Sequence, residues 1–340
     1  MKMLGLTICG SLVFSSFAVT AGQPQPAVPL QLEKTFNLDG SVKGRFDHFA
    51  ADPEHGRLFV VVKDYKAVLV LKSNSGELIH AIHLSEPQGV LYRSDLDSLY
   101  IADGERGAVE IVDGKTYQTK KSIKLRANAD AIAYDPASKS LYVVNGGADA
   151  KMTHTVISII DTTRAETVGE IEVDGDNLEA MALEKERAIM YVDNRAKNEV
   201  DVVDLKTRAV IAAWPVTLGK TMASLVLDEA GHRLFVGCRD GKIVVFDTQT
   251  GKETQALTIG PGIDDLVLDV ASKRIYAACG GSGTVDVYEE VDPDHYRLLG
   301  RISSGPLARN GLLIPSLKEY FVGVPSGEGR PARILVFQVQ

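Results

Sequence analysis

The chain has 340 residues, of which 45% are hydrophobic and 6% aromatic, and its formal net charge is −8. This apolar content can build a hydrophobic core, so the composition excludes disordered and collagen-like proteins. Binding to a nucleic-acid backbone needs a dense stripe of basic residues, whereas here 45 acidic residues outnumber 37 basic ones, so we expect no nucleic-acid partner.

The first 21 residues have the pattern of a secretory signal peptide. Lys2 provides a positive start, residues 3–19 are apolar or small, and residues 19–21 fit a small-residue cleavage site. A lipoprotein signal ending at Cys9 would follow too short an apolar run, and a retained anchor would be marginal for crossing the hydrocarbon layer. We therefore predict export to the periplasm or the exterior, leaving residues 22–340 as one domain with no transmembrane segment.

A pattern of eleven residues recurs along the remainder of the chain. In the clear copies an acidic residue precedes a turn and an apolar strand, as in Asp228-Glu-Ala-Gly-His-Arg-Leu-Phe-Val-Gly-Cys238. A repeat period of about 40 to 50 residues is typical of repeat architectures. Clear copies occupy residues 52–62, 135–145, 228–238 and 269–279, and weaker copies occupy residues 93–103, 184–194 and 314–324.

The same elements follow each copy, as in the strand at residues 242–247, the turn at 248–251 and the last strand at 254–259. Alternating Val, Ile, Tyr and Phe favour strands, and clusters of Asp, Ser, Thr and Gly favour tight turns. Every unit is therefore predicted to be a four-stranded antiparallel sheet, which makes the fold an all-β, seven-bladed β-propeller. The predicted blades span residues 44–84, 85–125, 126–173, 174–216, 217–259, 260–303 and 304–340.

The two ends of the chain complement each other. The seventh unit ends after three strands, the last of them at residues 333–338, and a surplus strand at residues 32–38 is similar to the last strands of other blades. Pairing the N-terminal strand into the last blade would close the ring and remove an exposed sheet edge. We therefore predict one closed domain and a monomer, in preference to an open array or two domains.

The repeat resembles a known family. Leu141-Tyr-Val-Val-Asn145 and its copies, followed by Gly and then a Val-x-Val-x-Asp strand, resemble the YVTN-type β-propeller repeat of exported bacterial proteins, over nearly the whole chain after residue 21. That family and the lactonase-like propellers near it include enzymes, cell-surface binding proteins and members of unknown role. The resemblance therefore implies the fold and leaves the function open.

The first strand of each blade should line the central channel, so the residue at its start should lie at the channel mouth. The strand pattern alone does not require polar residues there, so we predict a ligand site, with a solvated polar funnel as the alternative. The next position holds His48 in the first blade and Asn310 in the last. Counting five positions back from each repeat gives Asp47, Gln88, Asp130, Glu179, Ala223, Asp264 and Arg309.

A second ring is predicted from the residues that end the second strand of each blade. Asp103, Asn145 and Asn194 occur at this position, and their oxygen atoms would add to the rim of the mouth. Carboxylate and amide oxygens from several blades suit Ca²⁺, and they suit an amine or a polyhydroxylated ligand equally well. Arg309 is less compatible with a cation and would hold a ligand carboxylate.

Four further features bear on packing and chemistry. Cys238 and Cys279 hold the same position in adjacent blades, about 8–10 Å apart, so buried free thiols are favoured over a disulfide. His48 is the histidine placed for acid–base work, with a structural role as the alternative. The insertion at residues 146–153 is expected to overhang the mouth, and Trp214 is expected to pack between blades.

Two functions of different classes remain. The first, which we favour, is an exported binding or interaction protein whose mouth holds a small molecule, an ion or a protein or peptide partner. The predicted ligand-binding residues are Gln88, Asp103, Asn145, Asn194, Arg309 and Asn310.

The second function is a hydrolase similar to the lactonase-like propellers, in which bound Ca²⁺ would polarise a lactone carbonyl or orient a water. Its metal ligands would be Asp130, Glu179 and Asp264. His48 or Asp47 would accept a proton, and Arg309 would anchor a lactone or sugar acid. The sequence has no Glu-Gly-Pro or Pro-Asn-Gly segment, which the metal-dependent gluconolactonases carry, and this difference counts against the enzyme.

Overall fold

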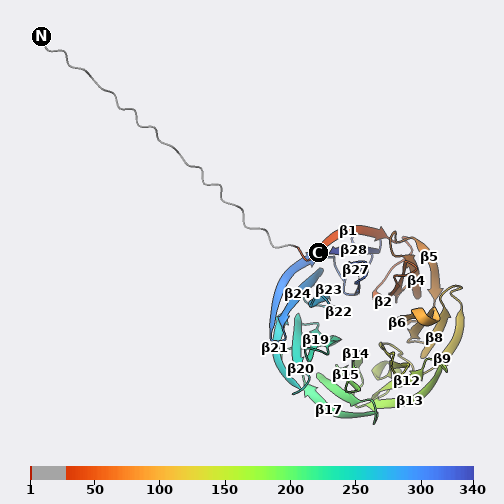
Figure 1. The fold of residues 1–340 in the computed structure, drawn as a ribbon. Coiled ribbons are helices and arrows are strands. Elements are labelled where there is room, and N and C mark those ends of the chain that lie inside the picture. Colours follow the sequence, from red (N-terminus) through yellow and green to blue (C-terminus); the bar gives the residue numbers. More distant parts are fainter. Residues whose placement is uncertain (2–27) are drawn as a thin grey trace.

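The computed structural model describes Met1 and residues 28–340, which form seven four-stranded sheets around a central channel (Figure 1). Neighbouring strands in each sheet are antiparallel, as in the first blade. The chain is therefore an all-β, seven-bladed β-propeller, as its sequence predicts. Residues 2–21 of the predicted signal peptide lie outside the described residues, so export stays a prediction.

The blades follow one another along the chain, and each runs from the channel outward. The first contains β2 (Phe46–Asp52), β3 (Arg57–Val62), β4 (Ala67–Lys72) and β5 (Leu78–His83). The second contains β6 (Pro87–Arg93), β7 (Ser98–Asp103), β8 (Ala108–Asp113) and β9 (Thr119–Lys124), and the third contains β10 (Ile132–Asp135), β11 (Ser140–Gly146), β12 (Thr155–Asp161) and β13 (Glu166–Val173). Short 3₁₀ turns η1 (Ser94–Leu96) and η2 (Ala148–Ala150) lie in the second and third blades.

The remaining blades repeat this order. The fourth contains β14 (Leu178–Glu184), β15 (Ile189–Asn194), β16 (Glu199–Asp204) and β17 (Ala209–Pro215), and the fifth contains β18 (Met222–Asp228), β19 (Arg233–Cys238), β20 (Lys242–Asp247) and β21 (Lys252–Thr258). The sixth contains β22 (Ile263–Asp269), β23 (Arg274–Cys279), β24 (Thr284–Asp292) and β25 (His295–Ser303). The seventh contains β26 (Gly311–Ile314), β27 (Glu319–Val324), β28 (Arg333–Val339) and the N-terminal strand β1 (Leu30–Asn37).

The last blade joins the two ends of the described chain. Its strand order is β1-β28-β27-β26, and β1 runs antiparallel to β28 with Leu30 opposite Val339 and Asn37 opposite Arg333. Figure 1 accordingly places the C-terminus beside β1. The surplus strand supplies the missing one, which confirms the predicted ring closure.

Hydrophobic cores between the blades hold the ring together. The middle strands β3 and β19 are buried along their whole length, whereas the outer strand β9 is mostly exposed. Trp214 lies between Tyr191 of its own blade and Phe246 of the next, with ring centroids 5.3 and 5.9 Å away. The tryptophan therefore packs between blades, as expected.

Both cysteines of the described chain, Cys238 and Cys279, are buried free thiols, as their repeat positions favour. Burial raises the pKa of each thiol to about 12, which makes them unreactive at neutral pH. Within the described residues, no helix is long and apolar enough to cross a membrane.

Most of the inner strands carry an irregularity where they begin. Register shifts fall between Phe46 and Phe49 in β2 and between Ile263 and Leu266 in β22, and β6, β14 and β18 shift at the same place. A bulge interrupts the alternation of side chains between the two faces of a strand. Two consecutive residues of one inner strand can therefore both face the channel.

Candidate functional site: the channel mouth

A cavity of about 230 Å³ occupies the channel mouth. Loops at the same end of the blades complete it, including the insertion in the third blade, which contributes Gly146, Ala148 and Asp149. The insertion therefore borders the mouth, as expected. All seven residues of the predicted first ring line this cavity: Asp47, Gln88, Asp130, Glu179, Ala223, Asp264 and Arg309.

A second cavity of about 230 Å³ adjoins the mouth, and His48 and Glu179 line both. Asp264 lines the mouth, whereas its neighbour Asp265 lines the second cavity. Regular alternation would have turned one of these two carboxylates away from the channel, and the bulge in β22 brings both to it. Both carboxylates of this consecutive pair therefore face the channel or the cavity that adjoins its mouth.

Asp264 is fully occupied by cationic and amide donors. Arg239 donates a hydrogen bond to its Oδ1, Arg309 Nε lies 3.2 Å from its Oδ2, and Asn310 Nδ2 donates to Oδ2 at 3.1 Å. Burial acts to raise the pKa of Asp264, but the two guanidinium groups outweigh it and hold that pKa below its ordinary value. Asp264 is therefore ionised and neutralised within the wall.

Glu179 is paired in the same way. Arg195 donates to its Oε1, and Arg195 Nε donates to the carbonyl oxygen of Met222 at 2.7 Å. The buried Asp193 accepts the backbone N–H groups of Glu179 and Ala180, both at 2.7 Å, and so fixes the start of β14. Burial raises the pKa of Glu179, and Arg195 offsets this only in part.

His48 is held as a cation between carboxylates. Its Nδ1 lies 3.2 Å from Asp265 Oδ1 and its Nε2 lies 3.7 Å from Asp47 Oδ1. Burial acts to lower the pKa of His48, but Asp265, Asp47 and Asp130 together raise it well above its ordinary value. A protonated imidazole has no lone pair for a proton, so this raised pKa counts against the predicted role of His48 as proton acceptor.

The remaining cations that line the mouth also have partners. Lys63 donates to Gln88 Oε1 and lies 3.2 Å from Glu86 Oε1. Arg45 Nη2 lies 2.7 Å from Asp64 Oδ1. Every cationic side chain in the wall of the mouth therefore already has an acidic partner in this chain, although Arg239 and Arg309 share Asp264.

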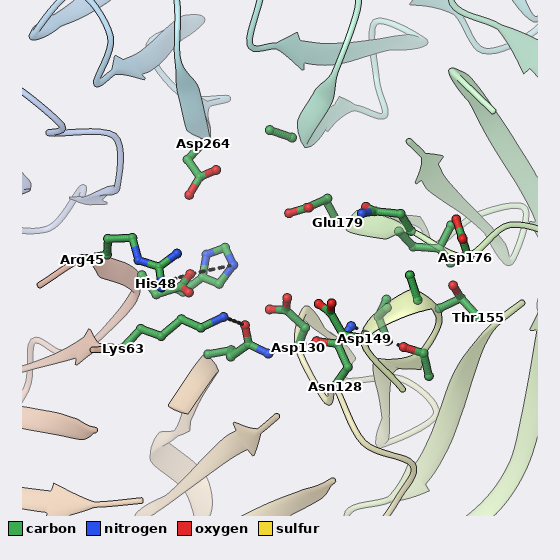
Figure 2. A pocket seen from close by; sticks show the side chains of 18 of the residues that line it. Arg45, His48, Lys63, Asn128, Asp130, Asp149, Thr155, Asp176, Glu179 and Asp264 are labelled. Carbon is green, nitrogen blue, oxygen red and sulfur yellow. Dashed lines mark hydrogen bonds and ion pairs between the residues drawn. The ribbon is translucent and has the colours of Figure 1, made fainter. Parts of the chain in front are cut away.

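Asp130, at the start of the third blade, differs from these paired residues. Figure 2 shows its carboxylate directed into the space that Glu179 and Asp264 also face. Within residues 28–340 its side chain has no hydrogen bond or ion pair, and the same holds for Asp149 and Asp176 in the adjoining loops. Burial, with Asp47 and Glu179 adding to it, raises the pKa of Asp130 to about 8.

The predicted second ring does not line the cavity. Asp103 accepts the backbone N–H groups of Ser85 and Glu86, and Asn145 donates to Ser158 Oγ at 2.9 Å. Asn194 donates to Asp201 Oδ2 at 2.8 Å. All three are fully buried, so they serve as structural links within their own blades or to the loop before them.

The residue directly after the second strand of a blade contributes to the wall of the mouth instead. Lys63, Arg195 and Arg239 each come directly after the second strand of their blades, and the first and last of them line the mouth. Sequence reasoning missed these cations because it stopped one residue early, at the end of the strand. Three basic residues at one repeat position are the signal that would have revealed them.

The geometry of the described residues adds no support to the predicted Ca²⁺ site. Within the described residues, no group of three or more His, Cys, Asp or Glu side chains is arranged to hold a metal ion. Of the predicted ligands Asp130, Glu179 and Asp264, the last two are engaged by guanidinium groups. A dication would have to displace those groups or lie against them.

Comparisons with known proteins agree with a YVTN-type propeller without identifying the family. No protein-family model matches the chain. It is 26% identical over 106 residues to the uncharacterized protein YncE of Salmonella typhi, and 24% identical over 106 residues to that of Salmonella typhimurium. Each match covers 31% of this chain and 30% of the relative, so it spans less than a third of either curated protein.

Solved structures show the same fold at low identity. A chain of hydrazine synthase from Kuenenia stuttgartiensis superposes with a TM-score of 0.70 at 17% identity, covering 84% of this chain and 93% of that one. A chain of a mitotic checkpoint complex superposes with a TM-score of 0.73 at 12% identity, covering 99% of both. These likenesses show the propeller fold alone, so the function has to be argued from the residues at the mouth.

Proposed function

We propose that this chain is a binding protein whose channel mouth holds a small ligand with a positively charged group, such as an amine. One observation carries the proposal: among the described residues, the cations of the wall all have partners, whereas three carboxylates have none. Those carboxylates belong to Asp130, Asp149 and Asp176. The mouth therefore lacks a cation.

The chemistry of Asp130 supports an amine in particular. A half-buried carboxylate with a pKa of about 8 is mostly protonated at neutral pH in the free protein. An ammonium group offers N–H donors and a positive charge, so it would replace that proton and relieve the repulsion from Asp47 and Glu179. A cavity of about 230 Å³ suits a small molecule.

The same contacts give less support to a calcium-assisted lactonase. Asp264 and Glu179 already neutralise arginines. The carboxylates around His48 raise its pKa well above the ordinary value, which makes it poorly suited to accept a proton. Arg309 is bound to Asp264, so it is not free to anchor a substrate carboxylate. A binding role needs none of these residues to change partners.

The test is a thermal-shift titration with matched probes. Putrescine carries two amines on a four-carbon chain, and 1,4-butanediol has the same skeleton without charge. Putrescine should raise the melting temperature of the wild type by about 3 °C at saturating concentration, and butanediol should leave it unchanged.

Two variants and a titration with Ca²⁺ serve as controls for this thermal-shift experiment. Asp130→Asn should remove the putrescine shift. Glu54→Gln makes the same change from acid to amide in the exposed turn between β2 and β3, at the end of β2 opposite to the mouth, and it should keep the shift. A shift that survives in Asp130→Asn would move the ligand away from this residue. A shift produced by Ca²⁺ alone would favour the metal-assisted enzyme instead.

We also propose that the protein is exported and matures at Gly22, which rests on the sequence pattern of its first 21 residues. N-terminal sequencing of protein recovered from the periplasm or medium checks this directly. Gly22 is the expected first residue, and full-length protein confined to the cytoplasm would contradict export.

A further inference from the structure

A further pocket, distinct from the two channel cavities, opens on the same face as the mouth. It lies between the sixth and seventh blades and has a volume of about 410 Å³. We call it the blade 6–7 groove. The loops after β23, β25 and β27 form its walls, at residues 281–283, 303–307, 324–328 and 330, together with Arg333 at the start of β28. None of its lining residues lines the mouth, so it is a separate site.

Arg333 is unlike the other arginines of residues 28–340. Each of those donates a hydrogen bond or forms an ion pair with another part of the chain, and Arg333 does neither. Its Nη2 lies against Gly305, where a Cβ atom would be only 3.3 Å away. The guanidinium group therefore rests on bare backbone at the groove wall, without an acceptor.

The surroundings of Arg333 increase this deficit. Burial and the nearby Arg330 guanidinium lower the pKa of Arg333, and Arg330 has only an exposed carboxylate, Glu328, at 4.0 Å. The hydroxyl of Ser304, which also lines the groove, is buried without a hydrogen-bond partner within the described chain. The Ser304 hydroxyl and the Arg333 guanidinium group therefore both lie in this groove without a hydrogen-bond acceptor from the described chain.

We propose that the blade 6–7 groove binds a small organic carboxylate that carries an apolar group. A planar guanidinium group matches a carboxylate through two parallel hydrogen bonds. The single unpaired positive charge of Arg333 matches a ligand with one negative charge. The net charge of −8 on the protein repels ligands with several negative charges. Pro306, Val324 and Pro325 line the groove, with the 62% exposed Leu307 at its edge, which provides an apolar surface for the rest of the ligand.

Calorimetric titration with N-acetyl-leucine and N-acetyl-leucinamide tests this proposal, because the two probes share one apolar body and only the first has a carboxylate. The wild type should bind the acid and not the amide. Arg333→Gln should weaken binding of the acid at least about tenfold. Arg164→Gln, an equal charge change at an exposed arginine paired with Asp161 elsewhere on the ring, should leave it unchanged.

Arg333→Lys keeps the charge and loses the two-pronged geometry, so it should weaken binding less than Arg333→Gln does. Equal binding of acid and amide, unchanged binding by Arg333→Gln, or no saturable binding of the acid to the wild type would overturn the proposal. Tighter binding of inorganic phosphate than of the acid would overturn the assignment to carboxylates. Asp130→Asn should bind N-acetyl-leucine normally, which separates this site from the mouth.

Discussion

Asp130 and Asp264 occupy the same repeat position on different sides of the mouth, and they differ in their partners. Asp264 receives Arg239, Arg309 and Asn310, whereas the side chain of Asp130 receives nothing from residues 28–340. Both are partly buried, yet the pKa of Asp264 lies below its ordinary value and that of Asp130 is about 8. Repeat position decides where a side chain lies, and its neighbours decide its charge.

The paired side of the mouth therefore stabilises the fold, and the unpaired side is left for a ligand. Proteins commonly retain destabilising arrangements where they bind or react. A substitution at each aspartate should consequently have opposite effects, which makes the comparison testable by stability measurements alone.

The largest effect is expected for Asp264→Asn. It would leave Arg239 and Arg309 close together without their shared carboxylate, and the free energy of unfolding should fall by about 2–4 kcal/mol. Urea denaturation measures this change. Glu170→Gln, which breaks an exposed pair with Arg126, should cost less than about 1 kcal/mol, and an equal loss in both variants would contradict the comparison.

Asp130→Asn should change the pH dependence of stability. Because the folded pKa of Asp130 is about 8 and its ordinary value is 3.8, the folded state holds a proton that the unfolded state lacks between about pH 4 and pH 8. This group's contribution to stability is therefore full below about pH 4 and is lost as pH rises through the folded pKa.

Between about pH 5 and pH 8.5, the wild type should thus lose on the order of 4 kcal/mol more stability than Asp130→Asn. Denaturation curves collected across this range provide the measurement. Parallel curves for the two proteins would show that Asp130 ionises normally and would remove the contrast with Asp264.

The same contrast between paired and unpaired side chains extends to the arginines, with a smaller effect. Arg333→Gln removes no hydrogen bond or ion pair of the described chain, so its free energy of unfolding should stay within about 0.5 kcal/mol of the wild type. Arg57→Gln, at a buried arginine bound to Asp52 and Asp97, should be clearly destabilising. Thermal melts of the two variants compare them, and a large loss in Arg333→Gln would reveal a structural partner.

The repeats in the sequence were sufficient to predict the fold, its closure by the N-terminal strand and the ring of residues at the mouth. They could not reveal the partners of those residues. Arg239 reaches Asp264 from a loop of the preceding blade, and the bulge in β22 turns Asp265 toward His48. Neither the path of a long side chain nor the position of a bulge is encoded in a repeat alignment.

The second predicted ring shows that residue type alone can indicate a ligand-binding role wrongly. Asn145 has the residue type of a ligand-binding group, but its Nδ2 donates to Ser158 and to the carbonyl oxygens of Val143 and Val156. A polar residue at the end of a buried strand is as readily used to satisfy the backbone as to bind a ligand. Composition cannot separate these uses, and the hydrogen bonds do.

Proton release on binding tests the central claim most directly. Putrescine is titrated calorimetrically at about pH 7 in two buffers of different ionisation enthalpy, so that the difference in heat counts the protons released. If the amine replaces the proton on Asp130, close to one proton should leave per ligand in the wild type and none in Asp130→Asn. Heat that is independent of the buffer, with equal affinity in both proteins, would contradict the account.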